Sequence, residues 1–309
     1  MVMVVLIDGG FSTQLKKHLR VDDAALAEKP LWCAEFVKTN SDAVVKTHAD
    51  YVAAGCDVIL TNTYQASVDG FHKYLGLDRE SSIDLMKRAV QLAKQASETT
   101  GNGCSVLVAG SVGPYGACLH DGSEYTGTYI ETLTQQQLMD WHRPRIQALV
   151  EAGVDLLAVE TIPAVGEAVA VLTLLKNEFP NQKAWISFTC KDELHISHGE
   201  TLKEAVAQCC QINRDQLVAV GINCSNPVFI ADLLRSAQDV PQRPPFVVYP
   251  NLGATWTPGV GWTDIDSNHP LVHYLPEWIS LGAEYIGGCC QTTAEDMKSC
   301  REYLDSKIK

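Results

Sequence analysis

The chain has 309 residues, of which 46% are hydrophobic, and it carries a formal net charge of −13. A surface of this sign repels phosphate backbones and anionic lipid, so the composition argues against a nucleic-acid-binding protein and against a membrane-surface protein. No stretch reaches the roughly 18 apolar residues that a membrane-spanning helix needs. The length and the apolar content together allow a large buried core.

The N-terminus is apolar over residues 1–7 but lacks a basic start, and it runs directly into Asp8-Gly9-Gly10. These features favour a first β-strand over a secretory signal peptide. The chain also contains eleven cysteines. Without a signal, so many cysteines indicate reduced thiols in the cytosol rather than a disulfide framework, so we expect a cytoplasmic protein.

Eight short β-branched runs recur along the chain, and helical stretches separate most of them. The predicted strands cover residues 2–7, 57–61, 105–109, 155–159, 184–189, 217–222, 246–249 and 284–286. The clearest predicted helices cover residues 43–52, 82–97, 167–178 and 201–211. Continuous apolar strands that alternate with helices indicate a parallel sheet covered on both faces.

Eight strand–helix units predict an α/β protein with a (β/α)8 TIM-type barrel. Proline and glycine are scattered and no linker is visible, so residues 1–309 are expected to form a single domain. A doubly wound open sheet is the competing arrangement. The barrel makes a specific prediction, because catalytic residues of such folds lie at the carboxyl ends of the strands.

Polar and metal-binding side chains do follow the predicted strands. The residues concerned are Asp8, Gly9 and Gly10 after the first strand, Asn62 and Tyr64 after the second, Glu160 after the fourth, Asn223 and Cys224 after the sixth, and Cys289 and Cys290 after the eighth. In a barrel these positions share one rim. The sequence therefore predicts a functional site there.

Three cysteines at this rim are candidate metal ligands. Cys289 and Cys290 follow Gly287-Gly288. Neighbouring residues on a regular strand point to opposite faces, so we expect the glycines to give the backbone the freedom to aim both thiols at one point. Cys224 lies at the end of the sixth predicted strand, two strands before the strand that leads to Cys289 and Cys290. Three thiolates with one open position are typical of a catalytic zinc site.

Placement alone leaves a second interpretation open for these cysteines. Cysteine is among the most buried residue types and often acts as a small apolar side chain. Cys209-Cys210 is another adjacent pair, but it lies inside a predicted helix, where core packing explains it.

The strand-end motifs, taken together and in order, resemble the homocysteine S-methyltransferase family. The motifs are Asp8-Gly9-Gly10, Thr61-Asn62-Thr63-Tyr64, Glu160-Thr161, Gly221-Ile222-Asn223-Cys224 and Gly287-Gly288-Cys289-Cys290. The resemblance implies a (β/α)8 barrel with one Zn²⁺ on Cys224, Cys289 and Cys290. It also implies a fourth coordination position that is open to the thiol of homocysteine.

The same resemblance implies roles for the other motifs. Asp8 and Glu160 would hold the α-ammonium of homocysteine, and backbone N–H groups around Gly9-Gly10 would face its carboxylate. In this family, betaine-using relatives carry a longer C-terminal extension and cobalamin-dependent ones carry cofactor domains, and we expect neither in this protein, because the sequence ends 19 residues after Cys290. We therefore expect a short enzyme of methionine biosynthesis that uses S-methylmethionine or S-adenosylmethionine, either as a monomer or as a small homo-oligomer.

Several residues keep alternative interpretations. Asp8 could be a turn residue, and Asn223 could orient a substrate group or a thiolate or instead shape a turn. Asn62 and Tyr64 could line the donor side or simply pack at a strand end. Another small thiol or selenol, such as selenocysteine, could be the acceptor. Rival functions are a barrel aldolase or phosphate-binding isomerase, for which Lys191 is the one strand-end lysine, and a thiol-based zinc store or redox sensor.

Overall fold

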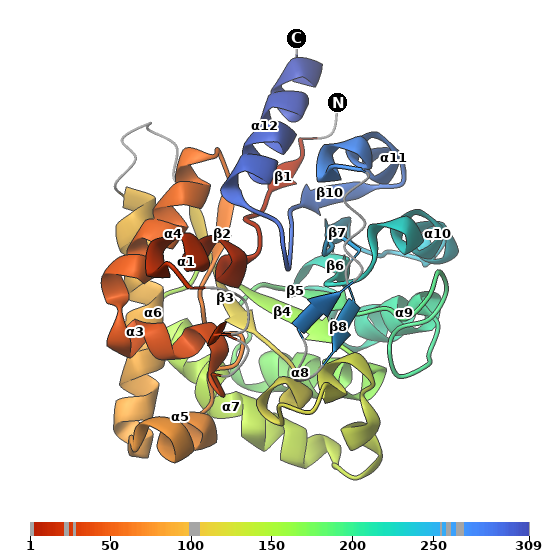
Figure 1. The fold of residues 1–309 in the computed structure, drawn as a ribbon. Coiled ribbons are helices and arrows are strands. Elements are labelled where there is room, and N and C mark those ends of the chain that lie inside the picture. The colour runs from red at the N-terminus through yellow and green to blue at the C-terminus, as the bar shows by residue number, and fades with distance from the viewer. Residues whose placement is uncertain are drawn as a thin grey trace.

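The computed structural model describes residues 3–21, 25–26, 29–98, 106–253, 255–257, 261–263 and 269–308. Eight parallel strands form one sheet in the order β1-β10-β7-β6-β5-β4-β3-β2 (Figure 1). They are β1 (Val5–Leu6), β2 (Val58–Leu60), β3 (Leu107–Val112), β4 (Leu156–Ile162), β5 (Ala184–Phe188), β6 (Leu217–Asn223), β7 (Phe246–Tyr249) and β10 (Ala283–Ile286).

The two ends of this sheet meet. Ile7 forms a parallel bridge with Val58, and the N–H of Asp8 donates to the carbonyl of Val58 at 3.0 Å. The first strand is thereby joined to the second as well as to the last. The prediction of a (β/α)8 barrel is confirmed, and the open doubly wound sheet is excluded.

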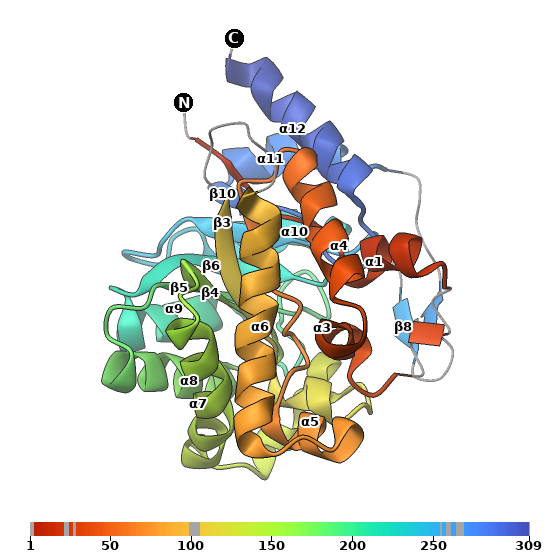
Figure 2. The ribbon, with the colours of Figure 1, turned by 90° about the vertical axis from the view of Figure 1, so that its left-hand side faces the viewer.

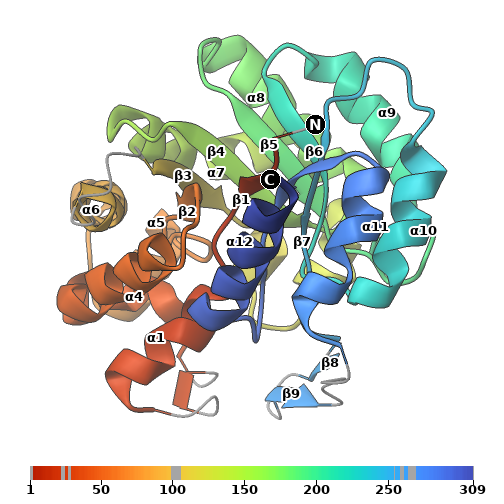
Figure 3. The same ribbon diagram turned by 90° about the horizontal axis from the view of Figure 1, so that it is seen from above.

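Helices surround the barrel, as the view from above shows (Figure 3). The α-helices are α1 (Phe11–Leu19), α3 (Phe36–Thr39), α4 (Ser41–Ala53), α5 (Val68–Leu75), α6 (Arg79–Glu98), α7 (Gln135–Glu151), α8 (Val165–Glu178), α9 (Leu202–Asn213), α10 (Pro227–Ala237), α11 (Leu275–Ser280) and α12 (Ala294–Ile308). Short 3-10 helices are η1 (Trp32–Glu35), η2 (Tyr115–Cys118), η3 (Ser123–Tyr125), η4 (Thr128–Glu131) and η5 (Leu271–His273). None of the described helices combines the length and apolar composition needed to cross a membrane.

Two strands extend further than the sequence predicts. The predicted strand 105–109 is observed as 107–112, and the predicted strand 155–159 is observed as 156–162. Because β4 continues to Ile162, Glu160 and Thr161 lie inside a strand and not after it. Gly110 lies within β3, where its missing side chain leaves room for Leu149 and Leu157, which a Cβ would approach at 3.1–3.3 Å.

The barrel interior is apolar at its centre and polar near the carboxyl ends of the strands. Trp185 is fully buried there and donates its indole N–H to the hydroxyl of Tyr249 at 2.9 Å. That hydroxyl lies 2.6 Å from Ser187, whose own hydroxyl donates to Oδ1 of Asn223 at 2.8 Å. This chain of hydrogen bonds forms a rigid layer directly beneath the strand ends.

A two-stranded antiparallel hairpin, β8 (Thr255–Thr257) and β9 (Gly261–Thr263), is inserted after β7. It stands out from the barrel on the side that also carries α1 (Figures 2 and 3).

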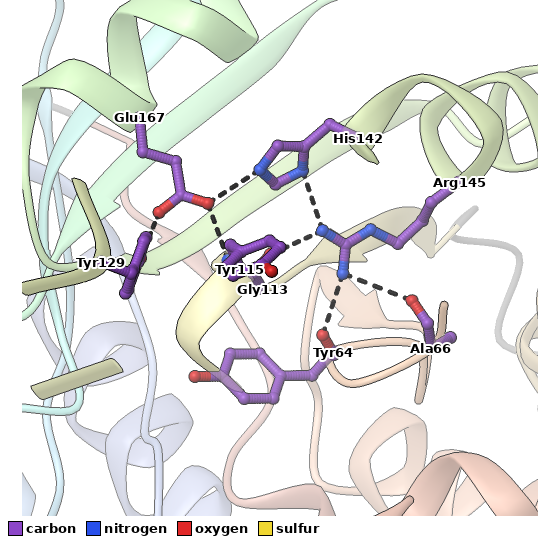
Figure 4. Close-up of polar contacts among 8 residues, drawn as sticks. All are labelled: Tyr64, Ala66, Gly113, Tyr115, Tyr129, His142, Arg145 and Glu167. Atoms are coloured by element: carbon purple, nitrogen blue, oxygen red, sulfur yellow. Dashed lines mark hydrogen bonds and ion pairs between the residues drawn. The ribbon is translucent and has the colours of Figure 1, made fainter. Parts of the chain in front are cut away.

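A buried polar network fastens the long connection between β3 and α7 to the outer helices (Figure 4). Glu167 on α8 accepts hydrogen bonds from the backbone N–H of Tyr115 at 2.7 Å, from Nε2 of His142 at 2.8 Å and from the hydroxyl of Tyr129. Glu167 and His142 are completely buried. Each polar contact therefore forms out of reach of water, where leaving one unmade is costly.

Arg145 extends the network to the strand ends. Its guanidinium donates to Nδ1 of His142 at 2.9 Å, to the carbonyl of Gly113 at 2.6 Å and to the carbonyl of Tyr64 at 3.1 Å (Figure 4). Because Nδ1 of His142 accepts and Nε2 donates, this histidine is neutral, and burial lowers its pKa. The network thus ties the loops after β2 and β3 to α7 and α8.

Removal of the Glu167 charge should destabilise the fold strongly. Glu167→Gln would remove the buried carboxylate that acts on the guanidinium of Arg145 through His142 and that accepts from Tyr115 and Tyr129, and we expect a loss of about 3 kcal/mol or more in the free energy of unfolding. Glu178→Gln is the matched control on the same helix, because Glu178 forms a partly exposed ion pair with Arg143. It should cost less than about 1 kcal/mol. Urea denaturation of both variants measures the difference, and equal losses would contradict the role assigned to the network.

Candidate metal centre and substrate cavity

The three predicted cysteines converge at the carboxyl ends of β6 and β10. The Sγ atoms of Cys224 and Cys290 lie 3.6 Å apart, and those of Cys289 and Cys290 lie 3.9 Å apart. All three Sγ atoms fall within 4.8 Å of one another, and this is a group that could hold a metal ion.

Backbone hydrogen bonds from the neighbouring strand ends place these cysteines. The N–H of Cys224 donates to the carbonyl of Tyr249 at 3.1 Å, and the N–H of Cys289 donates to the carbonyl of Pro250 at 2.7 Å. The loop after β7 therefore lies between the two cysteine segments and holds both. Cys224 has a φ of 47°, in the left-handed region that a residue with a side chain rarely adopts. Such strain persists only where surrounding contacts enforce it.

Gly287 and Gly288 act differently from what their sequence position suggests. Neither has a positive φ; the left-handed residue of this loop is Gln291, with a φ of 69°. Instead, the glycines permit close packing. A Cβ on Gly287 would lie 2.7 Å from that of Ile7, and a Cβ on Gly288 would lie 2.2 Å from Oγ1 of Thr292. The cysteine loop can therefore press directly against the end of β1.

The donor set fits a tetrahedral thiolate metal site. Four sulfur ligands at a bond length of about 2.3 Å would be separated by about 3.8 Å, which is close to the two measured Sγ separations. Hydrogen bonds from Cys289 and Cys290 lower the pKa of Cys224, whereas the pKa values of Cys289 and Cys290 are raised by their contacts with Cys224 and by burial. The protein alone thus favours one thiolate, and a bound dication would stabilise all three.

A cavity of about 240 Å³ opens beside the cysteines. One water needs roughly 10–15 Å³, so the cavity is large enough for a small-molecule substrate. The described lining residues most relevant to chemistry are Asp8, Gly9, Gly10, Asn62, Tyr64, Ser111, Glu124, Tyr125, Glu160, Thr161, Cys224, Cys289 and Cys290. Most of the predicted site residues therefore meet in one space, and Lys191 is not among the lining residues.

Asp8 and Glu160 are the two predicted carboxylates, and both are buried. An oxygen of Asp8 accepts from the backbone N–H of Leu60 at 2.8 Å, and burial raises the pKa of Asp8 well above its usual range. Glu160 accepts from the hydroxyl of Ser111, and burial raises its pKa to about 7. A bound cation would offset the energetic cost of burying both negative charges.

A bulge in β4 explains how adjacent residues can both face the cavity. The register with β5 shifts between Val159 and Ile162, and Thr161 has a φ of 59°. Oδ1 of Asn223 accepts from the N–H of Thr161 at 2.6 Å, while Nδ2 donates to its hydroxyl at 2.8 Å. Asn223 is fully buried and does not line the cavity. It lies in β6 and fixes the bulge, which differs from both the substrate contact and the turn that the sequence suggested.

The Gly9-Gly10 segment is packed too tightly for a side chain. A Cβ on Gly10 would lie 2.5 Å from the carbonyl oxygen of Cys289. The N–H of Gly10 donates to Oγ1 of Thr292 at 2.9 Å, so this group is used within the protein and does not face a substrate carboxylate. Phe11 and Ser12, at the N-terminus of α1, line the cavity beside Gly9 and Gly10. Their N–H groups lie at a helix end that favours anions.

Two important cavity residues were missed by the sequence reasoning. The hydroxyl of Tyr125 lies 3.4 Å from Sγ of Cys224, and Glu124 lines the same space. Both belong to η3, within the long connection that follows β3. The signal that could have found them is this length, because long loops at the carboxyl end of barrel strands commonly carry function.

The predicted donor-side residues Asn62 and Tyr64 do line the cavity. Nδ2 of Asn62 donates to the carbonyl of Cys33 at 3.1 Å, and its Oδ1 is buried with no hydrogen-bond partner in the described part of the chain. The backbone of Tyr64 is held by Arg145, as described above.

Comparisons with known proteins agree with this geometry. The family model described as homocysteine S-methyltransferase matches residues 5–304. The betaine-homocysteine S-methyltransferase of Drosophila melanogaster is 43% identical, over 96% of this chain and 93% of its own length. The selenocysteine Se-methyltransferase of Brassica oleracea var. italica is 36% identical, over 98% and 90%.

A solved structure supports the same assignment. The metallated form of the homocysteine methyltransferase MmuM from Escherichia coli superposes with a TM-score of 0.84 at 36% identity, covering 97% of this chain and 96% of that one. A family match over nearly the whole chain, joined to the convergence of the cysteine motifs in one cavity, is decisive. The chain belongs to the homocysteine S-methyltransferase family.

Proposed function

We propose that this protein is a zinc-dependent enzyme that transfers a methyl group from a sulfonium donor to the thiol of L-homocysteine, giving methionine. The observation that carries the proposal is the presence of Cys224, Cys289 and Cys290 in the same cavity as the buried carboxylates Asp8 and Glu160. Soft thiolate ligands suit zinc. Family membership supports homocysteine as the acceptor.

Cys224, Cys289 and Cys290 would hold the zinc. When bound, the metal would keep a coordinated substrate thiol deprotonated at neutral pH, where a free thiol with a pKa near 8.5 is mostly protonated. The three protein thiolates outweigh the charge of the dication, so they leave electron density on the substrate sulfur. The hydroxyl of Tyr125 lies 3.4 Å from Sγ of Cys224 and can donate a hydrogen bond to the Cys224 thiolate.

The amino acid part of homocysteine has a suitable place in the cavity. Asp8 and Glu160 together can bind its α-ammonium, because both carboxylates are buried and held by protein donors. The N-terminus of α1 can face its carboxylate in place of Gly10. Fixing both ends of the substrate orients its sulfur toward the cysteines, and such positioning accounts for a large share of rate acceleration.

The lining of the cavity supports a cationic donor. None of the described lining residues is lysine or arginine, whereas Phe11, Trp32, Tyr64 and Tyr125 contribute aromatic side chains. Aromatic faces attract sulfonium and ammonium cations. Transfer of a methyl group from a sulfonium to a thiolate breaks one S–C bond, forms another and neutralises charge on both sides.

Two close variants of this function are favoured by particular relatives. The Drosophila melanogaster relative is named for betaine, which is also a cation-bearing methyl donor. The Brassica oleracea relative is named for selenocysteine as acceptor. We infer a sulfonium donor because S-methylmethionine and S-adenosylmethionine carry an α-ammonium, which betaine lacks, and the described cavity lining contains carboxylates but no lysine or arginine. A cytoplasmic location and a monomeric or small homo-oligomeric state complete the proposal.

Loss of one ligand should abolish zinc binding. Purified wild-type protein is expected to retain about one zinc ion per chain, and Cys289→Ser should lose it after dialysis against a chelator, because a hydroxyl is a poor substitute for a thiolate. Cys210→Ser is the matched control, since Cys210 also belongs to an adjacent cysteine pair but lies in α9. Elemental analysis gives the result. Full zinc occupancy in the Cys289→Ser protein would overturn the ligand assignment.

A panel of donors tests the reaction. Zinc-loaded enzyme with homocysteine should form methionine from S-methylmethionine or S-adenosylmethionine, and at least about tenfold more slowly from betaine at equal concentration. Mass spectrometry with a deuterated donor methyl group identifies the transferred carbon. Methionine formation from betaine alone would reject the sulfonium donor. Methylation of selenocysteine but not of homocysteine would reject the acceptor.

A further inference from the structure

The cavity contains a third carboxylate for which homocysteine binding provides no role. Glu124, on η3, lines the cavity, and its Oε2 atom is buried with no hydrogen-bond partner among the described residues. Asp8 and Glu160 differ in this respect, because they accept hydrogen bonds from Leu60 and Ser111. A buried carboxylate oxygen without a donor is costly. Oε2 of Glu124 therefore needs a hydrogen-bond donor, and a ligand in the cavity can supply one.

The surroundings of Glu124 specify the chemistry of that partner. Oδ1 of Asn62 is a second buried acceptor in the same lining with no partner in the described chain. No described lining residue is lysine or arginine, and burial together with Lys73 lowers the pKa of His120, the one histidine among the described lining residues. The described lining thus contains unpaired hydrogen-bond acceptors but no lysine or arginine. The ligand that suits it best is a cation that carries N–H groups.

The possible methyl donors differ in this property. S-methylmethionine and S-adenosylmethionine each carry an α-ammonium with three N–H donors, in addition to a sulfonium that carries no hydrogen. Betaine carries a quaternary nitrogen, which also has no N–H. Aromatic faces such as those of Tyr64 and Tyr125 can accommodate the sulfonium. In S-methylmethionine, only the α-ammonium can donate hydrogen bonds to a carboxylate oxygen.

We propose that Glu124 binds the α-ammonium of the sulfonium donor and thereby selects donors that carry an amino acid group. The assignment rests on the proposed function, since it concerns the second substrate of the same cavity. It divides the three carboxylates between two ammonium groups: Asp8 and Glu160 bind that of homocysteine, and Glu124 binds that of the donor.

Glu124 is held in place before any ligand arrives. A Cβ on Gly116 would lie 2.7 Å from the backbone nitrogen of Glu124, so η2 packs directly against η3. Tyr129, which follows in η4, is fastened to Glu167 in the buried network of Figure 4. Burial, followed by the nearby thiolate of Cys224, raises the pKa of Glu124 to about 7. A fixed, incompletely solvated carboxylate is well suited to bind a cation.

A pair of donors isolates this interaction. S-methylmethionine and 3-dimethylsulfoniopropionate both carry a dimethylsulfonium and a carboxylate, but only the first has an α-ammonium. With zinc-loaded enzyme and saturating homocysteine, Glu124→Gln should lower kcat/KM for S-methylmethionine about 10- to 100-fold. The same variant should change kcat/KM for 3-dimethylsulfoniopropionate less than about threefold. Calorimetric titration should show a comparable weakening of S-methylmethionine binding, independent of turnover.

Two further variants complete the design. Glu131→Gln, in the same connection but 71% exposed, is the matched control and should leave both donors unaffected. Glu160→Gln should raise the KM for homocysteine, whereas Glu124→Gln should not. Zinc content and melting temperature confirm that each variant is folded, and Glu124→Asp, which keeps the charge, should restore part of the S-methylmethionine activity if the glutamine variant is unstable.

The outcomes separate the two levels of the proposal. Equal losses for both donors in Glu124→Gln, or a raised KM for homocysteine with unchanged donor kinetics, would overturn the role of Glu124 while wild-type activity leaves the proposed function intact. Wild-type protein that methylates homocysteine from no sulfonium donor would overturn the proposed function, and the role of Glu124 with it.

Discussion

The site depends on one constraint, which is the placement of three thiol sulfurs within 4.8 Å of one another beside the cavity at the strand ends. Thiolates at such separations repel each other, so protons stay within the cluster: hydrogen bonds from Cys289 and Cys290 lower the pKa of Cys224, and the contacts with Cys224 together with burial raise the pKa values of Cys289 and Cys290. The arrangement holds because backbone hydrogen bonds from Tyr249 and Pro250 fix the cysteines independently of their charge. A dication converts this repulsion into attraction.

The surrounding cavity also concentrates acidic groups that lack a positively charged protein partner. Asp8, Glu124 and Glu160 all carry raised pKa values, and burial is the largest cause in each case. The described lining contains no lysine or arginine to neutralise them. Two cationic substrate groups would restore the balance, one from each substrate. In the proposed reaction, substrate charge rather than a protein side chain would complete the site, which is how a site rich in acidic groups would bind two amino acids.

Much of this arrangement was predictable because barrels impose a simple rule. Strand-end positions share a rim, so Asp8, Glu160 and the cysteines could be grouped from the sequence alone. The rule does not reveal which strand-end residues point inward. Asn223 differs from expectation because the bulge at Thr161 requires both ends of its amide. Register shifts of this kind depend on contacts between strands and leave little trace in local sequence.

Glu124 and Tyr125 escaped prediction for a related reason. They lie in η3, far along a connection whose path is determined by Arg145, His142 and Glu167, none of which reaches the cavity. The buried network restrains the connection from outside while the tight contact at Gly116 restrains it from within. In the proposed function, the site would therefore have two separate supports: the barrel rim would hold the metal and homocysteine, and the fastened connection would hold the donor. Donor preference can then change through substitutions in the connection while the thiol chemistry at the rim remains the same.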